Sequence, residues 1–262
     1  MNPPLPPVRL ERFDVLDSTN LHARRQIRSG AIGAHDGPVL YIAAEQTGGL
    51  GRHGRPWSSP RGGLWMTLVS PVGSALDSLQ TLGLRVGAAC LAAMVRVCEG
   101  GPDGAAGVRL KWPNDVLVDG RKILGVLSET VRHPAGGTWA LIGVGVNANF
   151  PAALLPVGLR REPTSLLDRL GREVDLDDLR EDLCARLLAA LNEPNTAAAL
   201  SLTRERLFGL GGPVTLSLPG GAPIRGTLVG LSDDGLPVVR TSEGQVVALP
   251  GCEMHIPSEG AP

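Results

Sequence analysis

A loop rich in glycine and arginine brings together residue types that bind anions. At positions 47–57 the chain reads Thr-Gly-Gly-Leu-Gly-Arg-His-Gly-Arg-Pro-Trp. Glycine lets the backbone approach a ligand closely, and Arg52 or Arg55 can give a phosphate or carboxylate charge-assisted hydrogen bonds. This pattern predicts a mobile flap over an anionic ligand, with Trp57 over a flat ring. A solvated surface loop is the alternative, because both residue types are common outside regular structure.

The same loop contains a G-x-G-x-x-G string at Gly49, Gly51 and Gly54. In dinucleotide-binding domains this string opens a helix, and an acidic residue follows about 20 positions later. Here the chain continues Arg-Pro-Trp-Ser-Ser-Pro, which cannot start a helix. The context therefore argues against a Rossmann-type nucleotide site.

The only two lysines of the chain, Lys111 and Lys122, lie eleven positions apart. The other 23 basic residues are arginines, a bias typical of a GC-rich genome. Because arginine is the default cation here, the two lysines mark positions where a compact ammonium is needed, against a phosphate or a carboxylate. Each lysine adjoins a strand pattern, so we expect both to project from one region of a sheet toward the ligand under the glycine loop.

Three further strings add polar or small residues. Lys-Trp-Pro-Asn-Asp at 111–115 ends in Asp115, which could hold a hydrated Mg²⁺ beside phosphate oxygens, or be part of an ordinary turn. Ser-Thr-Asn at 18–20 is a plain helix N-cap or a set of hydrogen-bonding partners for a polar ring. Gly-Val-Gly-Val-Asn at 143–147 would let a planar ring lie close to the backbone.

The elements that must position these residues alternate between strand and helix patterns. A capped helix is expected between residues 20 and 30, where Gly30 stops it. Periodicity predicts strands at 39–44, 64–69, 108–112, 116–118, 122–129 and 139–147, and helices at 79–97, 164–170, 176–191 and 197–207. Asp119-Gly120 is a strong hairpin signal.

The chain divides into a large unit and a small one. We expect a Pro-rich disordered stub at 1–7, a large unit at 8–208, a small antiparallel β-barrel at 209–257 and a tail at 258–262. The barrel is expected because short alternating runs separated by glycine, proline and Asp-Gly follow the composition change near residue 209.

Composition excludes several classes of protein. With 25 Lys and Arg against 26 Asp and Glu, the chain has no excess charge of one sign to gather nucleic acid. We also expect no membrane span and no secretion signal, because the apolar stretches are interrupted well short of about 20 residues. The four cysteines form no C-x-x-C pair and are expected to be buried thiols. A cytoplasmic protein is predicted.

Five strings together resemble the biotin protein ligase family. They are Asp-Ser-Thr-Asn at 17–20, the loop at 46–57, Lys-Trp-Pro-Asn-Asp at 111–115, Gly-Arg-Lys-Ile-Leu-Gly at 120–125 and Gly-Val-Gly-Val-Asn at 143–147. Each string alone is weak evidence, but all five occur in the order and spacing of that family. The resemblance covers nearly the whole chain.

This resemblance implies an α+β fold, with a mixed-sheet catalytic domain of the biotin/lipoate ligase type and a C-terminal SH3-like barrel. The implied activity uses ATP and Mg²⁺ to convert biotin into biotinyl-5′-AMP. The biotinyl group then passes to one lysine of a biotin carboxyl carrier protein, the acetyl-CoA carboxylase subunit. No covalent enzyme intermediate is needed, which agrees with the lack of a Ser-His-Asp or Cys-His signature.

The resemblance also implies residue roles. Biotin would be bound by Ser18, Thr19, Asn20, Gln46, Gly49, Leu50, Gly51, Arg52, Lys122 and Gly125. ATP or the adenylate would be bound by Arg52, Arg55, Trp57, Lys111, Asn114, Asp115 and Asn147, with Asp115 as the metal ligand. Lys111, Arg52 and Lys122 would be the catalytic cations.

Two departures from the family and two rival functions remain open. Leu50 stands where the family loop usually has arginine, and only a short Pro-rich stub precedes Val8, so we expect no DNA-binding domain and no repressor function. A lipoate or octanoate transferase of the same fold is the first alternative, and a non-enzymatic biotin sensor is the second. The oligomeric state is expected to be a monomer or a homodimer.

Overall fold

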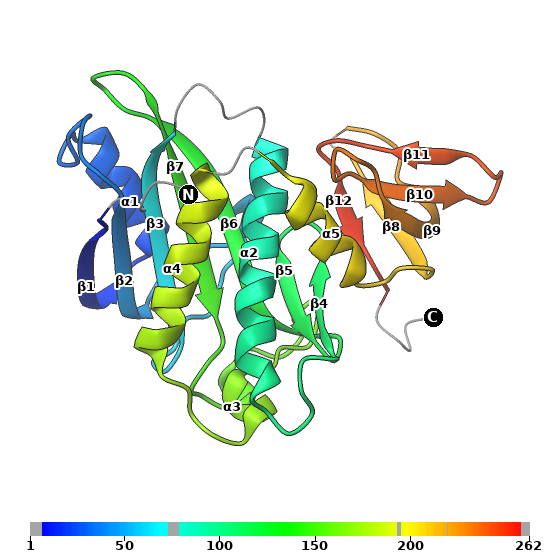
Figure 1. The fold of residues 1–262 in the computed structure, drawn as a ribbon, viewed down its shortest axis with the longest axis horizontal. Helices are drawn as coiled ribbons and strands as arrows, with labels where there is room; N and C mark the ends of the chain where they lie inside the picture. The colour runs from blue at the N-terminus through cyan, green and yellow to red at the C-terminus, as the bar shows by residue number, and fades with distance from the viewer. Residues whose placement is uncertain (1–6, 73–78, 193–194, 219, 258–262) are drawn as a thin grey trace.

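The computed structural model describes residues 7–72, 79–192, 195–218 and 220–257, which form two β-sheets with helices packed around the larger one (Figure 1). Most of the expected N-terminal stub and the expected tail at 258–262 lie outside the described residues.

The larger sheet is mixed and has seven strands. In spatial order they are β1 Arg9–Leu16, β2 Val39–Gln46, β3 Leu64–Val72, β7 Thr138–Val146, β6 Arg121–Arg132, β5 Asp115–Val118 and β4 Val108–Lys111. β1 pairs in parallel with β2, and every other neighbouring pair is antiparallel. The α+β class with a mixed sheet is therefore confirmed, and each of the six expected strands is present.

Helices cover both faces of this sheet. α2 (Leu79–Glu99), α4 (Leu176–Asn192) and α5 (Ala197–Glu205) lie on one face, and α1 (Thr19–Arg28) lies on the other (Figure 1). The short α3 (Leu166–Leu170) and two 3₁₀ turns, η1 (Arg52–Gly54) and η2 (Ala152–Leu154), lie in the connections. The main core fills the space between the sheet and α2 and α4.

α2 is the central helix of this core. By length and apolar composition its residues Thr81–Glu99 could cross a membrane, but 61% of that stretch is buried inside the protein. Its two cysteines are buried free thiols, and burial raises the pKa of Cys90 to about 12 and that of Cys98 to about 11. The helix therefore packs as the core helix of a globular protein, and its thiols are poor nucleophiles.

Two local signals explain where site elements begin and turn. The Asp17 carboxylate accepts from the Ser18 amide at 2.7 Å, and Ser18 caps α1. At the β5–β6 turn, Asp119 and Gly120 have φ values of 48° and 75°. Positive φ at both positions is what a two-residue hairpin of this type requires, so Lys122 is placed two residues after a tight turn.

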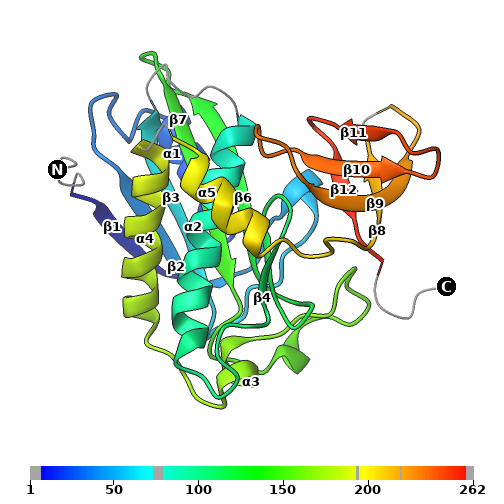
Figure 2. The ribbon, with the colours of Figure 1, turned by 45° about the vertical axis from the view of Figure 1, so that its right-hand side comes forward.

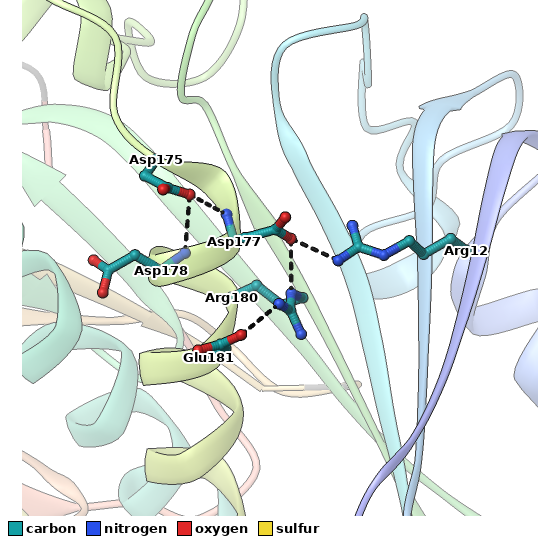
Figure 3. A network of polar contacts seen from close by, with 6 residues as sticks. All are labelled: Arg12, Asp175, Asp177, Asp178, Arg180 and Glu181. Atoms are coloured by element: carbon teal, nitrogen blue, oxygen red, sulfur yellow. Dashed lines mark hydrogen bonds and ion pairs between the residues drawn. The ribbon is translucent and has the colours of Figure 1, made fainter.

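β1 was not expected as a strand. It is an edge strand, and an ion pair with α4 ties it to the rest of the protein: Arg12 donates to Asp177 Oδ1 at 2.7 Å (Figure 3). Asp177 also accepts from Arg180, while Asp175 caps the helix through the amides of Asp177 and Asp178 (Figure 3). The Arg12 and Asp177 side chains are 53% and 60% exposed, so solvent screens this pair and it contributes little to stability.

The second sheet has five antiparallel strands, in the order β11 Val246–Ala248, β10 Pro237–Thr241, β9 Ile224–Leu231, β8 Pro213–Ser217 and β12 Glu253–His255. α5 contacts both α2 and β9; it lies between α2 and this sheet in Figure 1 and crosses in front of α2 in Figure 2. Leu84 of α2 and Trp112 enter its core, and Trp112 Nε1 donates to the Gly235 carbonyl at 2.9 Å. This sheet is compatible with the expected SH3-like barrel and is packed directly against the large unit.

Candidate active site

One cavity of about 900 Å³ lies on the face of the large sheet that carries α1. Every residue assigned to biotin, nucleotide or metal from the sequence lines it. The structure therefore brings all five strings together. The cavity is also lined by residues from the connection after η2 and from β12, which the sequence did not suggest.

A buried polar network forms one end of the cavity. Gln46 Oε1 accepts from the Thr19 amide at 2.8 Å and lies 3.1 Å from Thr19 Oγ1. Gln46 Nε2 donates to Ser59 Oγ at 2.8 Å, and Ser59 Oγ donates to the Trp57 carbonyl at 3.2 Å. These links join the start of α1 to the glycine loop. Ser18, whose hydroxyl caps the helix, is buried beside them.

Three glycines hollow out the middle of the sheet. Gly125 and Gly145 are register partners on β6 and β7, and Gly143 lies two residues away on the same face. The indole of Trp57 lies on the first two: an added Cβ would come within 3.0 Å of the indole at Gly125 and 2.7 Å from Nε1 at Gly145. Trp57 itself is thus the planar ring that packs against these glycines. Its buried Nε1 has no hydrogen-bond partner among the described residues.

Cations gather at the other end of the cavity. Lys122 Nζ lies 2.7 Å from Asp115 Oδ1 and 4.8 Å from the centre of the Trp57 ring. Arg52 Nη1 donates to Asn114 Oδ1 at 3.1 Å. The two lysines therefore lie in one region of the sheet, as expected, on strands β4 and β6.

The environment of Lys111 is short of negative charge. Burial lowers the pKa of Lys111; Asp115 opposes this effect, and the positive charges of Lys122, Arg161 and Arg52 add to it. Asp115 is the carboxylate that offsets these positive charges at Lys111. An anionic ligand at this end would relieve their mutual repulsion.

Asn147 is used both structurally and as a free acceptor. Its Nδ2 donates to the carbonyls of Thr164 at 3.0 Å and Lys122 at 3.4 Å, so the amide ties β7 to the chain that leads into α3. Its buried Oδ1 has no hydrogen-bond partner within the described ranges. Asn147 Oδ1 is thus an unpaired buried acceptor on a residue that lines the cavity.

Sequence reasoning missed Glu253 of β12, which binds the glycine loop. Its carboxylate accepts from Arg55 Nη2 at 2.7 and 2.9 Å and lies 2.6 Å from His53 Nε2. Burial acts to raise the pKa of Glu253, but the hydrogen bond and charge of Arg55, helped by His53 and Arg52, outweigh it and lower the pKa. No local signal marks Glu253, because its partners lie about 200 positions earlier in the chain.

Arg161 is a second missed residue at the cavity. It donates to the Gly120 carbonyl at 3.2 Å and to the Ile256 carbonyl at 3.0 Å, and its guanidinium lies 4.9 Å from the centre of the Phe208 ring. It therefore joins the β5–β6 turn to the end of the second sheet. Leu50 also lines the cavity, with 37% of the residue exposed.

Residues 13–149, more than half of the chain, match the sequence profile of the biotin/lipoate A/B protein ligase family. The chain belongs to this family. Its curated relatives include the Biotin--[acetyl-CoA-carboxylase] ligases of Paracoccus denitrificans and Mycobacterium tuberculosis. The first is 33% identical over 91% of this chain and 96% of the relative, and the second is 31% identical over 94% and 89%.

Solved ligases have the same fold. The Aquifex aeolicus biotin protein ligase in complex with biotin and ATP is 25% identical, with a TM-score of 0.77 over 94% of this chain and 98% of that one. The Leishmania major biotin protein ligase in complex with biotinyl-5-AMP is 28% identical, with a TM-score of 0.63 over 93% and 99%.

Enzymes that act on ATP commonly bind it together with Mg²⁺. No group of three His, Cys, Asp or Glu side chains that could enclose a metal occurs in the part of the chain that the structure describes. Mg²⁺ keeps several waters and is bound through one or two carboxylates plus substrate phosphates. Asp115 fits that description, because its Oδ1 is the oxygen paired with Lys122 and the carboxylate lies at the end of the cavity where the cations gather.

Proposed function

We propose that this chain is an ATP-dependent biotin protein ligase. It adenylates biotin to biotinyl-5′-AMP and transfers the biotinyl group to a lysine of a biotin carboxyl carrier protein. One observation carries the proposal: one cavity joins a buried polar end, formed by Thr19 and Gln46, to an end lined by Lys111, Lys122 and Arg52. The curated relatives and the solved ligases with biotin, ATP and biotinyl-5-AMP support the same activity.

The polar end binds the ureido ring of biotin. Ser18, Thr19, Asn20 and Gln46 offer hydroxyl and amide groups that match a ring carbonyl and two ring N–H groups. Gly49, Leu50, Gly51 and Gly125 line the path of the rest of the molecule. The valeryl carboxylate then lies toward Lys122 and Arg52, whose charges neutralise it.

Adenylation joins the two halves of the cavity. A carboxylate oxygen of biotin attacks the α-phosphorus of ATP, the bond from that phosphorus to the bridging oxygen breaks, and pyrophosphate leaves. Lys111 faces the phosphates, and Arg52 and Lys122 stabilise the charge that develops at the α-phosphate. Asp115 would hold Mg²⁺, which would supply positive charge to neutralise the phosphates. Arg55, Trp57, Asn114 and Asn147 contact the nucleotide.

Transfer needs no enzyme nucleophile. The ε-amine of the carrier lysine attacks the acyl carbon, the acyl–phosphate oxygen bond breaks, AMP leaves and the amine loses a proton. The loop at 47–57 excludes water from the mixed anhydride until the lysine arrives. Glu253 supports this task because it holds Arg55 and His53 of the loop against the second sheet.

The proposal extends to partner and compartment. The relatives named for acetyl-CoA carboxylase favour the carrier subunit of that enzyme as the acceptor. A cytoplasmic location and a monomer or homodimer remain part of the prediction. Four buried free thiols suit a reducing compartment.

The decisive experiment measures pyrophosphate release by the purified chain with ATP, Mg²⁺ and one acid at a time: biotin, lipoate or octanoate. We expect release with biotin alone, followed by labelling of a recombinant carrier domain and no labelling of the carrier in which the acceptor lysine is arginine. Release with lipoate or octanoate in place of biotin would overturn the substrate assignment.

A further inference from the structure

The side chain of Asn20 lies over the centre of the large sheet. Thr67 of β3, Gly143 of β7 and Leu127 of β6 are register partners across three strands. Asn20 Oδ1 accepts from Thr67 Oγ1 at 2.6 Å, and Asn20 Nδ2 lies 3.5 Å from the Leu127 carbonyl. Gly143 leaves the necessary room, because an added Cβ would lie 2.1 Å from Asn20 Oδ1. The amide is thus held at 5% exposure between defined partners.

Glu129 of β6 holds the other side of this amide. Its Oε2 accepts from Asn20 Nδ2 at 3.1 Å, and its Oε1 is paired with Arg24 Nη2. Arg24 lies four residues after Asn20, so one face of α1 supplies both partners of the carboxylate. The Arg24 and Glu129 side chains are 30% and 27% exposed, which places the ion pair between the buried amide and solvent.

This arrangement decides which way the amide points. The oxygen and nitrogen of an asparagine amide are nearly the same size, so only their hydrogen-bond partners set the orientation. A carboxylate and a carbonyl accept but cannot donate. If the amide of Asn20 were flipped, its oxygen would face Glu129 and the Leu127 carbonyl, and its NH₂ would face the Thr67 hydroxyl. Glu129 therefore forces Nδ2 toward itself and leaves Oδ1 above Gly143, a glycine that lines the cavity together with Asn20.

We propose that Glu129 is a positioning residue for ligand recognition: it fixes the Asn20 amide so that Oδ1, an acceptor, faces the ligand ring. The inference rests on the proposed function, in which that ring is the ureido ring of biotin and presents N–H donors. A flipped amide would oppose NH₂ to N–H and leave two buried donors unpaired. Arg24 keeps the carboxylate of Glu129 in place, and Thr67 sets the second contact of Oδ1.

A polarity swap tests this role. Glu129→Gln lets the new amide at position 129 donate or accept, so Asn20 loses its fixed orientation. Asn20→Asp places two carboxylates face to face. We expect each single variant to weaken biotin binding about tenfold or more, since a hydrogen bond to a charged group is lost or opposed. In Glu129→Gln, KM for ATP and kcat should stay within about twofold.

The double variant Asn20→Asp/Glu129→Gln separates orientation from packing. Here the amide introduced at position 129 can donate to one oxygen of the carboxylate introduced at position 20, while the other oxygen still faces the cavity as an acceptor. Total charge and side-chain size match the wild type. We expect biotin affinity to recover to within about threefold of wild type, so that the two losses do not add. A purely structural role predicts the sum of both losses.

Binding is measured by calorimetry with biotin alone, beside pyrophosphate release, and folding is followed by thermal unfolding. Asp177→Asn is the matched control, because it breaks an Arg–carboxylate pair with Arg12 on the opposite face of the sheet. If Asn20→Asp does not fold, the result for Glu129→Gln alone decides. Wild-type biotin affinity in Glu129→Gln would overturn the proposal. A double variant whose loss of affinity equals the sum of the two single losses would overturn it as well. A wild-type chain that binds biotin without releasing pyrophosphate contradicts the proposed function only, and one that does not bind biotin contradicts both.

Discussion

Trp57 and Gly145 are in direct contact: a Cβ at position 145 would lie 2.7 Å from the indole Nε1. Real Cβ atoms do not approach another atom so closely, so any side chain at 145 must displace the ring or shift the strand. The contact joins the glycine loop to the centre of the sheet. It also places a buried N–H, unpaired among the described residues, at the junction of the two ends of the cavity.

The first prediction follows from this contact. Gly145→Ala should displace the Trp57 indole from the sheet and raise KM for biotin about tenfold or more. The loop then loses its packing contact with β7, and a misplacement of about 1 Å can cost about a hundredfold in rate. Steady-state pyrophosphate release measures the effect. Gly83→Ala is the matched control, since a Cβ there meets no atom within 4 Å. Equal kinetics of the two variants would contradict a role for this contact.

The second prediction concerns the anchor of the loop in the second sheet. Glu253→Gln removes the charge that holds Arg55 and His53, so the loop should open more often and release biotinyl-5′-AMP several-fold faster. Free adenylate, detected by labelling of bystander lysines, measures the release. Glu243→Gln, at an exposed glutamate in the turn between β10 and β11, serves as control. If Glu253→Gln retains biotinyl-5′-AMP as well as the wild type does, Glu253 has no role in keeping the loop closed.

Glu253 also predicts a pH dependence of folding stability. Its folded-state pKa lies below the ordinary 4.5, so the pairing with Arg55 and His53 stabilises the folded protein above about pH 4.5 and is lost as pH falls through the lower value. Wild type should therefore be more stable than Glu253→Gln at pH 7, and the difference should vanish in acid. Chemical denaturation at pH 7 and at pH 3 to 4 compares the two free energies of unfolding. A difference that does not depend on pH would contradict this source of stability.

The third prediction tests Arg52, whose guanidinium reaches Asn114 across the cavity. Arg52→Gly removes the loop cation nearest to the proposed adenylate phosphate. One charge-assisted contact is worth about 1.5 to 3 kcal/mol, so the adenylate should escape at least tenfold faster. Leu50→Arg is the informative companion variant, because it adds a cation beside the same phosphate and should tighten adenylate binding. Unchanged retention in Arg52→Gly would contradict the assignment.

Local patterns predicted most of the fold. The helices and six strands of the large unit follow from periodicity. The turn at Asp119-Gly120 follows from the residue types, because aspartate and glycine tolerate the positive φ values that both positions adopt. β1 was missed because apolar and polar residue types do not alternate along it: it is an edge strand with one neighbour, and its polar residue Arg12 is paired with α4.

The site was predictable only where its residues share short strings. Lys111 and Lys122 lie on neighbouring hairpins of β4, β5 and β6, so their proximity follows from sequence spacing. Glu253 and Glu129 act on residues more than 100 positions away, through contacts that exist only after the sheet and the second domain have packed. Their chemistry is ordinary for surface glutamates, and nothing in the neighbouring sequence separates them from the others.

The last prediction uses the buried charge of Lys111. Burial and the nearby positive charges lower its pKa below the ordinary 10.5. As the pH rises, the side chain that faces the ATP phosphates therefore loses its proton, and with it its charge, earlier than an exposed lysine does. The alkaline limb of kcat/KM for ATP, which reports the free enzyme, should therefore begin below pH 10.5. Arginine stays protonated throughout this range, so Lys111→Arg should lose that limb. Its rate at saturating biotin should fall as well, because a longer planar guanidinium misplaces the charge in a closed cavity.

Lys122→Arg is the matched control for the alkaline limb: it keeps Lys111 and should keep the limb, while KM for biotin rises. Pyrophosphate release from pH 7 to 10 measures both profiles, and an alkaline limb that persists unchanged in Lys111→Arg would assign the titration to another group.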